Sequence, residues 1–93
     1  MRNYEFTVIF NANEDNTQAG LEFVTSTFAA ADVEITKQDD MGVKYLASDI
    51  KKQEKGHYVY FEMKADPSRI LGFEQAFLLN QNILKFLFVN PEK

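Results

Sequence analysis

The chain has 93 residues, of which 45% are hydrophobic and 26% charged, and its formal net charge is -4. This length suits one domain with a modest core, and the composition is too apolar for a disordered chain. The absence of cysteine excludes disulfides and thiolate metal sites. The acidic balance argues against indiscriminate attraction to nucleic acid. We therefore expect one folded domain spanning residues 1–93.

The first part of the chain predicts a strand followed by a helix. Over residues 4–10, Tyr4, Phe6, Val8 and Phe10 alternate with more polar positions, as expected of a strand with one buried face. Asp15 and Gln18 resemble a capping box that opens a helix. We expect this helix to continue to about Ala31 and to face a sheet through one apolar stripe, formed by Leu21, Val24 and Phe28.

The middle of the chain predicts two strands joined by a turn. Residues 33–47 form a long extended stretch with a bend or bulge expected at residues 39–42. Residues 51–56 are typical of a polar hairpin loop, in which Gly56 would supply a positive φ. In the strand that follows, one side is formed by Val59, Phe61 and Met63, and the other by Tyr58 and Tyr60.

The last third predicts a helix and a final strand. Asp66 and Pro67 suit the N-cap and the first helical position, and residues 83–89 form the closing strand. The order β-α-β-β-α-β predicts an α+β fold of the ferredoxin-like, split βαβ type. In this fold two helices cover one face of a four-stranded antiparallel sheet. Tyr58 and Tyr60 would then lie on the face that the helices leave open.

The chain offers little of the chemistry that an enzyme needs. His57 is the only histidine, so no histidine-centred triad or multi-histidine zinc site is expected. The four glycines match neither a P-loop nor a dinucleotide-binding fingerprint. We expect no catalysis, metal or cofactor. No apolar run is long enough to cross a bilayer and the opening residues lack the core of a signal peptide, so we expect a cytoplasmic protein.

Charge is unevenly distributed along the chain. Residues 1–40 carry eight acidic and two basic side chains, whereas residues 41–64 carry five basic and three acidic ones. The remaining residues carry three of each sign. Because lysine and arginine neutralise phosphates, the middle segment is the part expected to face nucleic acid.

Three segments together resemble the bacterial small-subunit ribosomal protein family numbered six. Residues 1–5 (Met-Arg-Asn-Tyr-Glu) are similar to the family's opening. Residues 42–51 (Gly-Val-Lys-Tyr-Leu-Ala-Ser-Asp-Ile-Lys) are similar to its central signature, and residues 55–61 (Lys-Gly-His-Tyr-Val-Tyr-Phe) to its hairpin and aromatic strand. Two positions depart from the signature: Tyr45 replaces a polar residue, and Ser48 replaces a tyrosine.

The resemblance implies a ferredoxin-like constituent of the small ribosomal subunit. Such a protein binds the central domain of 16S ribosomal RNA as a heterodimer with the small basic ribosomal protein numbered eighteen. An acidic surface would face the basic partner while a local basic edge faces phosphate. The positions that the resemblance and the charge pattern assign to RNA or partner binding are Arg2, Tyr4, Lys44, Lys51, Lys52, Lys55, His57, Tyr58, Tyr60 and Lys85.

Other interpretations of these residues stay open at this point. Tyr4 shares the parity of Phe6, so core packing is at least as good an interpretation, and any one lysine could simply be solvated. His57 could be an exposed histidine beside a turn. For the whole chain, the alternative is a ferredoxin-like ligand-sensing or homo-oligomerising module that pairs through its tyrosine face.

Overall fold

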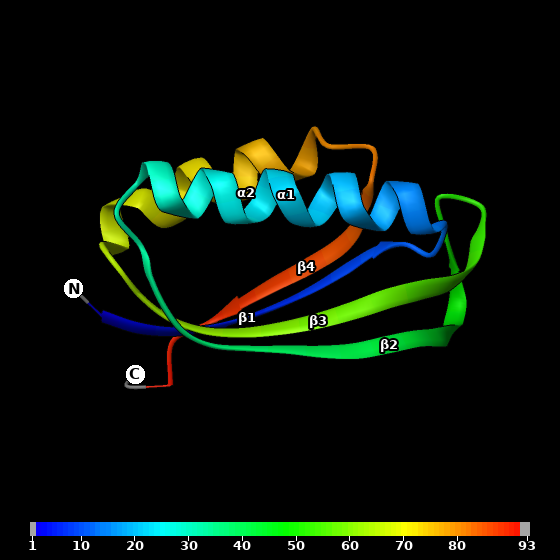
Figure 1. Ribbon diagram of the computed structural model, residues 1–93, viewed down its shortest axis with the longest axis horizontal. Coiled ribbons are helices and arrows are strands. Elements are labelled where there is room, and N and C mark those ends of the chain that lie inside the picture. The colour runs from blue at the N-terminus through cyan, green and yellow to red at the C-terminus, as the bar shows by residue number, and fades with distance from the viewer. Residues whose placement is uncertain (1, 92–93) are drawn as a thin grey trace.

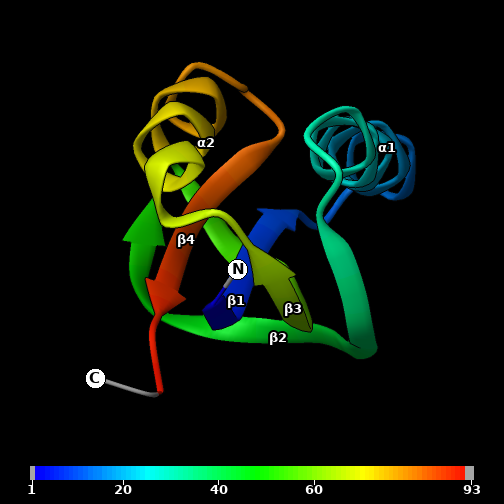
Figure 2. The ribbon, with the colours of Figure 1, turned by 90° about the vertical axis from the view of Figure 1, so that its left-hand side faces the viewer.

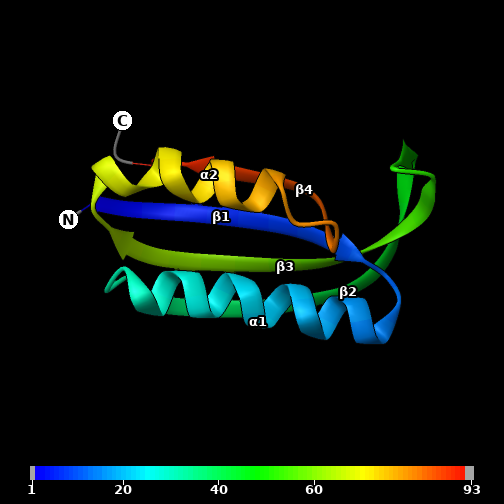
Figure 3. The ribbon, with the colours of Figure 1, turned by 90° about the horizontal axis from the view of Figure 1, so that it is seen from above.

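The computed structural model describes residues 2–91, which form a four-stranded antiparallel sheet with both helices on one face (Figures 1 and 2). The strand order is β2-β3-β1-β4. Seen from above, α1 lies over β2 and β3, and α2 lies over β1 and β4 (Figure 3). The ferredoxin-like prediction is confirmed. The elements are β1 (Arg2–Asn11), α1 (Glu14–Ala30), β2 (Glu34–Ile50), β3 (Gln53–Ala65), a 3-10 turn (Pro67–Arg69), α2 (Ile70–Leu78) and β4 (Ile83–Val89).

A phenylalanine-rich core joins the sheet to the helices. The predicted inward residues of β1 and β3 are buried, and Phe6 and Phe61 are fully covered. The Phe6 ring stacks on Phe88 with centroids 4.4 Å apart and meets Phe28 of α1 edge-on at 5.5 Å. Such aromatic pairs contribute about 0.5–1.5 kcal/mol each beyond their buried area. This core packs one face of the sheet against both helices and leaves its other face uncovered.

A polar side chain caps the start of each helical segment. The capping residue of α1 differs from the predicted one. The N-cap of α1 is Asn13, whose Oδ1 accepts the backbone N–H of Asp15 at 3.0 Å, so the predicted capping box of Asp15 and Gln18 is wrong. Asp66 caps as predicted and accepts from the Ser68 N–H at 3.0 Å. The residues after it first make a 3-10 turn, and α2 begins at Ile70. No helix within residues 2–91 is long and apolar enough to span a membrane.

Strand β2 is bent where the sequence predicts it. Its register against β3 shifts between Asp40 and Gly42, and Gly42 has a φ of 81°. The Asp40 carboxylate accepts the Gly42 N–H at 2.9 Å, which fixes the bulge. A positive φ of this kind favours glycine because it has no Cβ to clash with the backbone. The bulge lets the outer part of the β2–β3 hairpin curve away from the sheet plane (Figure 1).

The turn of the β2–β3 hairpin is tighter than predicted. Only Lys51 and Lys52 form it, with φ values of 50° and 66°, and Gln53 already pairs with Ile50. The predicted loop over residues 51–56 and the positive φ of Gly56 are therefore wrong. Gly56 is instead buried within β3, where an added Cβ would collide with the Ile9 side chain. The glycine serves close packing here, since two strands and the curved hairpin meet at this point.

Candidate nucleic-acid interface

A mixed basic and aromatic cluster lies at one end of the open face of the sheet. Tyr58 on β3 pairs with Ile9 on β1, and Ile9 pairs with Lys85 on β4. Directly paired residues point to the same face, so these three form a row across the sheet. The Nζ of Lys44 on β2 lies 5.6 Å from the Tyr58 ring centroid, within cation–π range. We call Lys44, Tyr58, Ile9 and Lys85 the basic end of the open face.

The hairpin turn adds two lysines beside the basic end. Lys51 reaches across the sheet and donates from Nζ to the backbone carbonyl of Ile83 at 3.0 Å, at the start of β4. Figure 2 shows the end of β2 rising beside β4. Lys51 and Lys52 are both exposed. Both adopt the left-handed backbone conformation, which costs a non-glycine residue roughly 1–2 kcal/mol. The chain thus places two ammonium groups at a turn where asparagine and glycine are the usual residues.

Lys55 and Tyr45 form a second exposed cationic and aromatic pair. They lie directly opposite each other on β3 and β2, and the Lys55 Nζ stands 4.9 Å from the Tyr45 ring centroid. Tyr45 is 74% exposed, so its ring is available for stacking. From the sequence alone, Tyr45 is only a position that departs from the family signature. Its exposure makes it a candidate contact that sequence reasoning missed, because strand alternation alone does not separate a covered ring from a free one.

His57 lies away from this cluster and is engaged with Asp40. Its Nε2 is 2.5 Å from the Asp40 Oδ1, linking β3 to the bulge of β2. The pKa of Asp40 lies below its ordinary value because the Gly42 N–H donates to the carboxylate, and the bond to His57 lowers it further. By strand alternation His57 points to the helix side of the sheet. Its evident role is to fasten the bulge.

The other end of the open face is acidic. Tyr60 donates its hydroxyl proton to Glu62 at 3.0 Å, and Glu62 lies directly opposite Glu5. Desolvation, the bond to Glu62 and the charge of Glu5 together raise the pKa of Tyr60 to about 12. Asp39 pairs with Tyr60 from β2 and adds a further carboxylate. We call Glu5, Glu62, Tyr60 and Asp39 the acidic end; Tyr60 thus belongs to a different surface from Tyr58.

The two candidates at the start of β1 also lie apart from the basic end. Tyr4 is 8% exposed and belongs to the hydrophobic core, which supports the core interpretation of this residue. Arg2 is exposed, seven residues from Ile9 along β1. At about 3.4 Å per residue, Arg2 is roughly 24 Å from the basic end. The structure thus brings together Lys44, Lys51, Lys52, Tyr58 and Lys85, and separates Arg2, Tyr4, His57 and Tyr60 from them.

The described residues contain no candidate metal centre. Within residues 2–91 no three histidine, cysteine or acidic side chains are grouped closely enough to hold a metal ion. Lysine side chains beside a tyrosine ring, by contrast, combine phosphate attraction with a base-stacking surface.

Comparison with known proteins places this fold in a family. The family model for ribosomal protein S6 matches residues 3–90. The small ribosomal subunit protein bS6 of Treponema denticola is 37% identical over 92 residues, which cover 99% of both chains. The bS6 protein of Helicobacter acinonychis is 32% identical over 91 residues, covering 96% of this chain and 64% of that protein.

Two solved structures share the fold. The crystal structure of 30S ribosomal protein S6 from Thermotoga maritima superposes with a TM-score of 0.88 at 22% identity, covering 98% of this chain and 88% of that one. The solution structure of the C-terminal domain of MgtC from Mycobacterium tuberculosis reaches a TM-score of 0.67 at 10% identity, covering 99% and 89%. At these identities the likeness concerns the fold alone.

Proposed function

Because the chain belongs to the ribosomal protein S6 family, we propose that it acts as an architectural protein of the small ribosomal subunit, binding 16S ribosomal RNA together with the small basic ribosomal protein numbered eighteen. The observation that carries the proposal is the division of the open sheet face into a basic end and an acidic end. A single acidic protein can in this way offer separate surfaces to an anionic and to a cationic partner.

RNA would bind at the basic end and the hairpin turn. Lys44, Lys51, Lys52 and Lys85 supply four ammonium groups for phosphates, and Tyr58 supplies a ring for an unpaired base. Four phosphate contacts predict a steep salt dependence, with a slope of about -3 in the plot of log affinity against log salt. Such binding orders an RNA junction and involves no turnover.

The basic protein partner would dock on the acidic end. Glu5 and Glu62 face each other as like charges, and Lys37, opposite Glu62 on β2, offers one ammonium group to the two carboxylates. Beside them on β4, Leu87 and Val89 are 60% and 41% exposed. Apolar side chains next to an excess of carboxylates suit a partner that offers lysine or arginine together with apolar contacts.

Binding measurements with the purified partners test this proposal. The wild-type chain should form a heterodimer with protein eighteen, and the pair should bind a central-domain fragment of 16S ribosomal RNA. The double variant E5Q/E62Q should bind protein eighteen about tenfold more weakly. The double variant E14Q/E22Q removes the same charge from α1 and should bind normally. A wild-type chain that forms only its own dimer and captures neither partner would favour the ligand-sensing module.

A further inference from the structure

A groove between α2 and β4 lies around the edge of the sheet from the basic end. It is a cavity of about 370 Å³, open to solvent on one side. Its apolar wall combines Phe77 and Leu78 of α2 with Ile83 and Phe86 of β4. Phe77 is fully buried, whereas Phe86 is only half-buried and meets Phe77 at 5.8 Å between ring centroids. The groove therefore presents one partly free aromatic ring.

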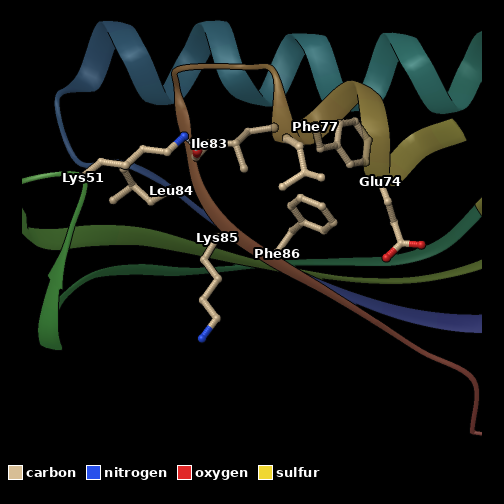
Figure 4. Close-up of a pocket in the computed structure, with 8 residues that line it drawn as sticks. Lys51, Glu74, Phe77, Ile83, Leu84, Lys85 and Phe86 are labelled. Atoms are coloured by element: carbon tan, nitrogen blue, oxygen red, sulfur yellow. Dashed lines mark hydrogen bonds between the residues drawn. The ribbon is translucent and has the colours of Figure 1, made fainter. Parts of the chain in front are cut away.

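Two charged side chains stand at the ends of this apolar wall, and a third lies on its outer side. Figure 4 shows Lys51 beside Ile83 at one end of the groove and Glu74 at the other, while Lys85 directs its ammonium group away from the groove. The bond from Lys51 to the Ile83 carbonyl uses one of the three donors of the ammonium group, so two remain. Lys85 also belongs to the basic end of the open face, so cationic side chains connect the open face with the groove.

We propose that this groove receives one unpaired nucleotide of the RNA bound at the basic end, with its base against Phe86 and its flanking phosphates on Lys51 and Lys85. This inference rests on the proposed function and deepens it. Unpaired bases of RNA are recognised by stacking on aromatic rings and by hydrogen bonds to their edges, both of which the groove offers. The two lysines favour an anionic occupant over a purely apolar peptide.

Glu74 makes the groove selective among bases. A carboxylate only accepts hydrogen bonds, so it pairs well with the exocyclic amino group of cytosine, adenine or guanine. The one donor on the pairing edge of uracil, N3–H, lies between two carbonyl oxygens that a carboxylate repels. A nucleotide with an amino-bearing base should therefore bind more tightly than a uridine nucleotide. Exchanging Glu74 for glutamine should remove most of this preference while leaving the apolar wall unchanged.

Two matched variants test whether the groove is used. L78W places a large ring in the groove, whereas L71W places the same ring elsewhere on α2, at a position 65% exposed that does not line the cavity. Both variants should melt like the wild type. L78W should lower the affinity for the central-domain RNA by about 5- to 150-fold, the range expected for losing one stacked base, and L71W should leave it unchanged. Equal RNA affinity for L78W and wild type would overturn the inference.

A nucleotide titration separates this inference from the proposed function. Cytidine 5′-monophosphate should shift the amide resonances of residues 83–86 in the wild-type chain at lower concentrations than uridine 5′-monophosphate, and E74Q should respond alike to both. If the chain binds no ribosomal RNA but shows this pattern, the proposed function is contradicted and nucleotide binding in the groove is supported. If it binds RNA and neither nucleotide moves these resonances, only nucleotide binding in the groove is contradicted. If L78W loses protein eighteen and keeps RNA, the groove is a protein-docking site and the inference is overturned.

Discussion

Replacing Lys52 by glycine should stabilise the protein even though it removes a charged side chain from an exposed turn. Lys52 has a φ of 66°, where a Cβ costs roughly 1–2 kcal/mol, and glycine avoids this cost. Glycine also has more conformational freedom in the unfolded chain, and this entropy offsets about 0.5–1 kcal/mol of the stabilisation. The net stabilisation should be close to 1 kcal/mol, which raises the melting temperature of a domain of this size by about 4–8 °C.

K52A is the matched control because it removes the same charge but keeps the Cβ. Thermal and urea unfolding should show K52A near wild type and K52G above both. K51G should gain less than K52G, because it relieves the same strain at φ 50° but loses the bond to the Ile83 carbonyl, worth about 0.5–1.5 kcal/mol. Equal melting temperatures for K52A and K52G would refute the account of backbone strain at this turn.

Three further variants test the packing of two glycines and the charge of Asp40. G56A should destabilise the protein by about 1–3 kcal/mol in urea unfolding, because the new methyl group meets Ile9; G72A, on α2 with open space around the added Cβ, should instead stabilise by about 1 kcal/mol. The lowered pKa of Asp40 stabilises the fold above its ordinary value of 3.8, and this contribution is lost as pH falls through the lower folded value. Wild type should therefore lose more stability than D40N between pH 5 and about pH 2. Equal losses would show that the ionised carboxylate of Asp40, with its bonds to the Gly42 N–H and to His57, contributes nothing to stability.

Much of this fold follows from simple periodicities in the sequence. The period of two around Phe6 and Phe61 predicted which faces of β1 and β3 are buried, since both strands pack one face on the helices. Polar caps and turns were harder to predict. Asn13 and Asp15 are both good cap residues, and the helix uses the one that lets Thr17 close on Asn11 by a bond of 2.6 Å from its hydroxyl to the backbone carbonyl.

The hairpin shows why a glycine is a weak guide by itself. Gly56 suggested a loop with a positive φ, but the structure uses it for close approach to Ile9 and bends the chain at Lys51 and Lys52 instead. Local sequence preference favours glycine at such a turn. The long-range contact from Lys51 to Ile83, 32 residues away, is invisible to a local pattern. This contact holds the turn against β4 and helps to stabilise lysine at a turn position where glycine is locally preferred.

The candidate interface could be predicted only in part. The excess of lysine over residues 41–64 located the basic segment, and the alternation of β3 placed Tyr58 and Tyr60 on the open face. Their separation into a basic and an acidic end depends on register, because Tyr58 lies beside Lys44 whereas Tyr60 lies beside Glu62. Strand register is set by side-chain packing and turn geometry over the whole sheet. Counting charges along the sequence therefore does not reveal the strand register.

The measurement that tests the division of the open face most directly compares two double variants of equal charge. K44M/K85M removes two lysines from the basic end, and K37M/K64M removes two lysines paired with the acidic residues Glu62 and Glu34. In a salt titration of binding to the central-domain RNA, K44M/K85M should bind more weakly, with its salt slope reduced by about 2, and K37M/K64M should match the wild type. Equal losses in both variants would contradict the account, because RNA binding would then depend on total charge alone.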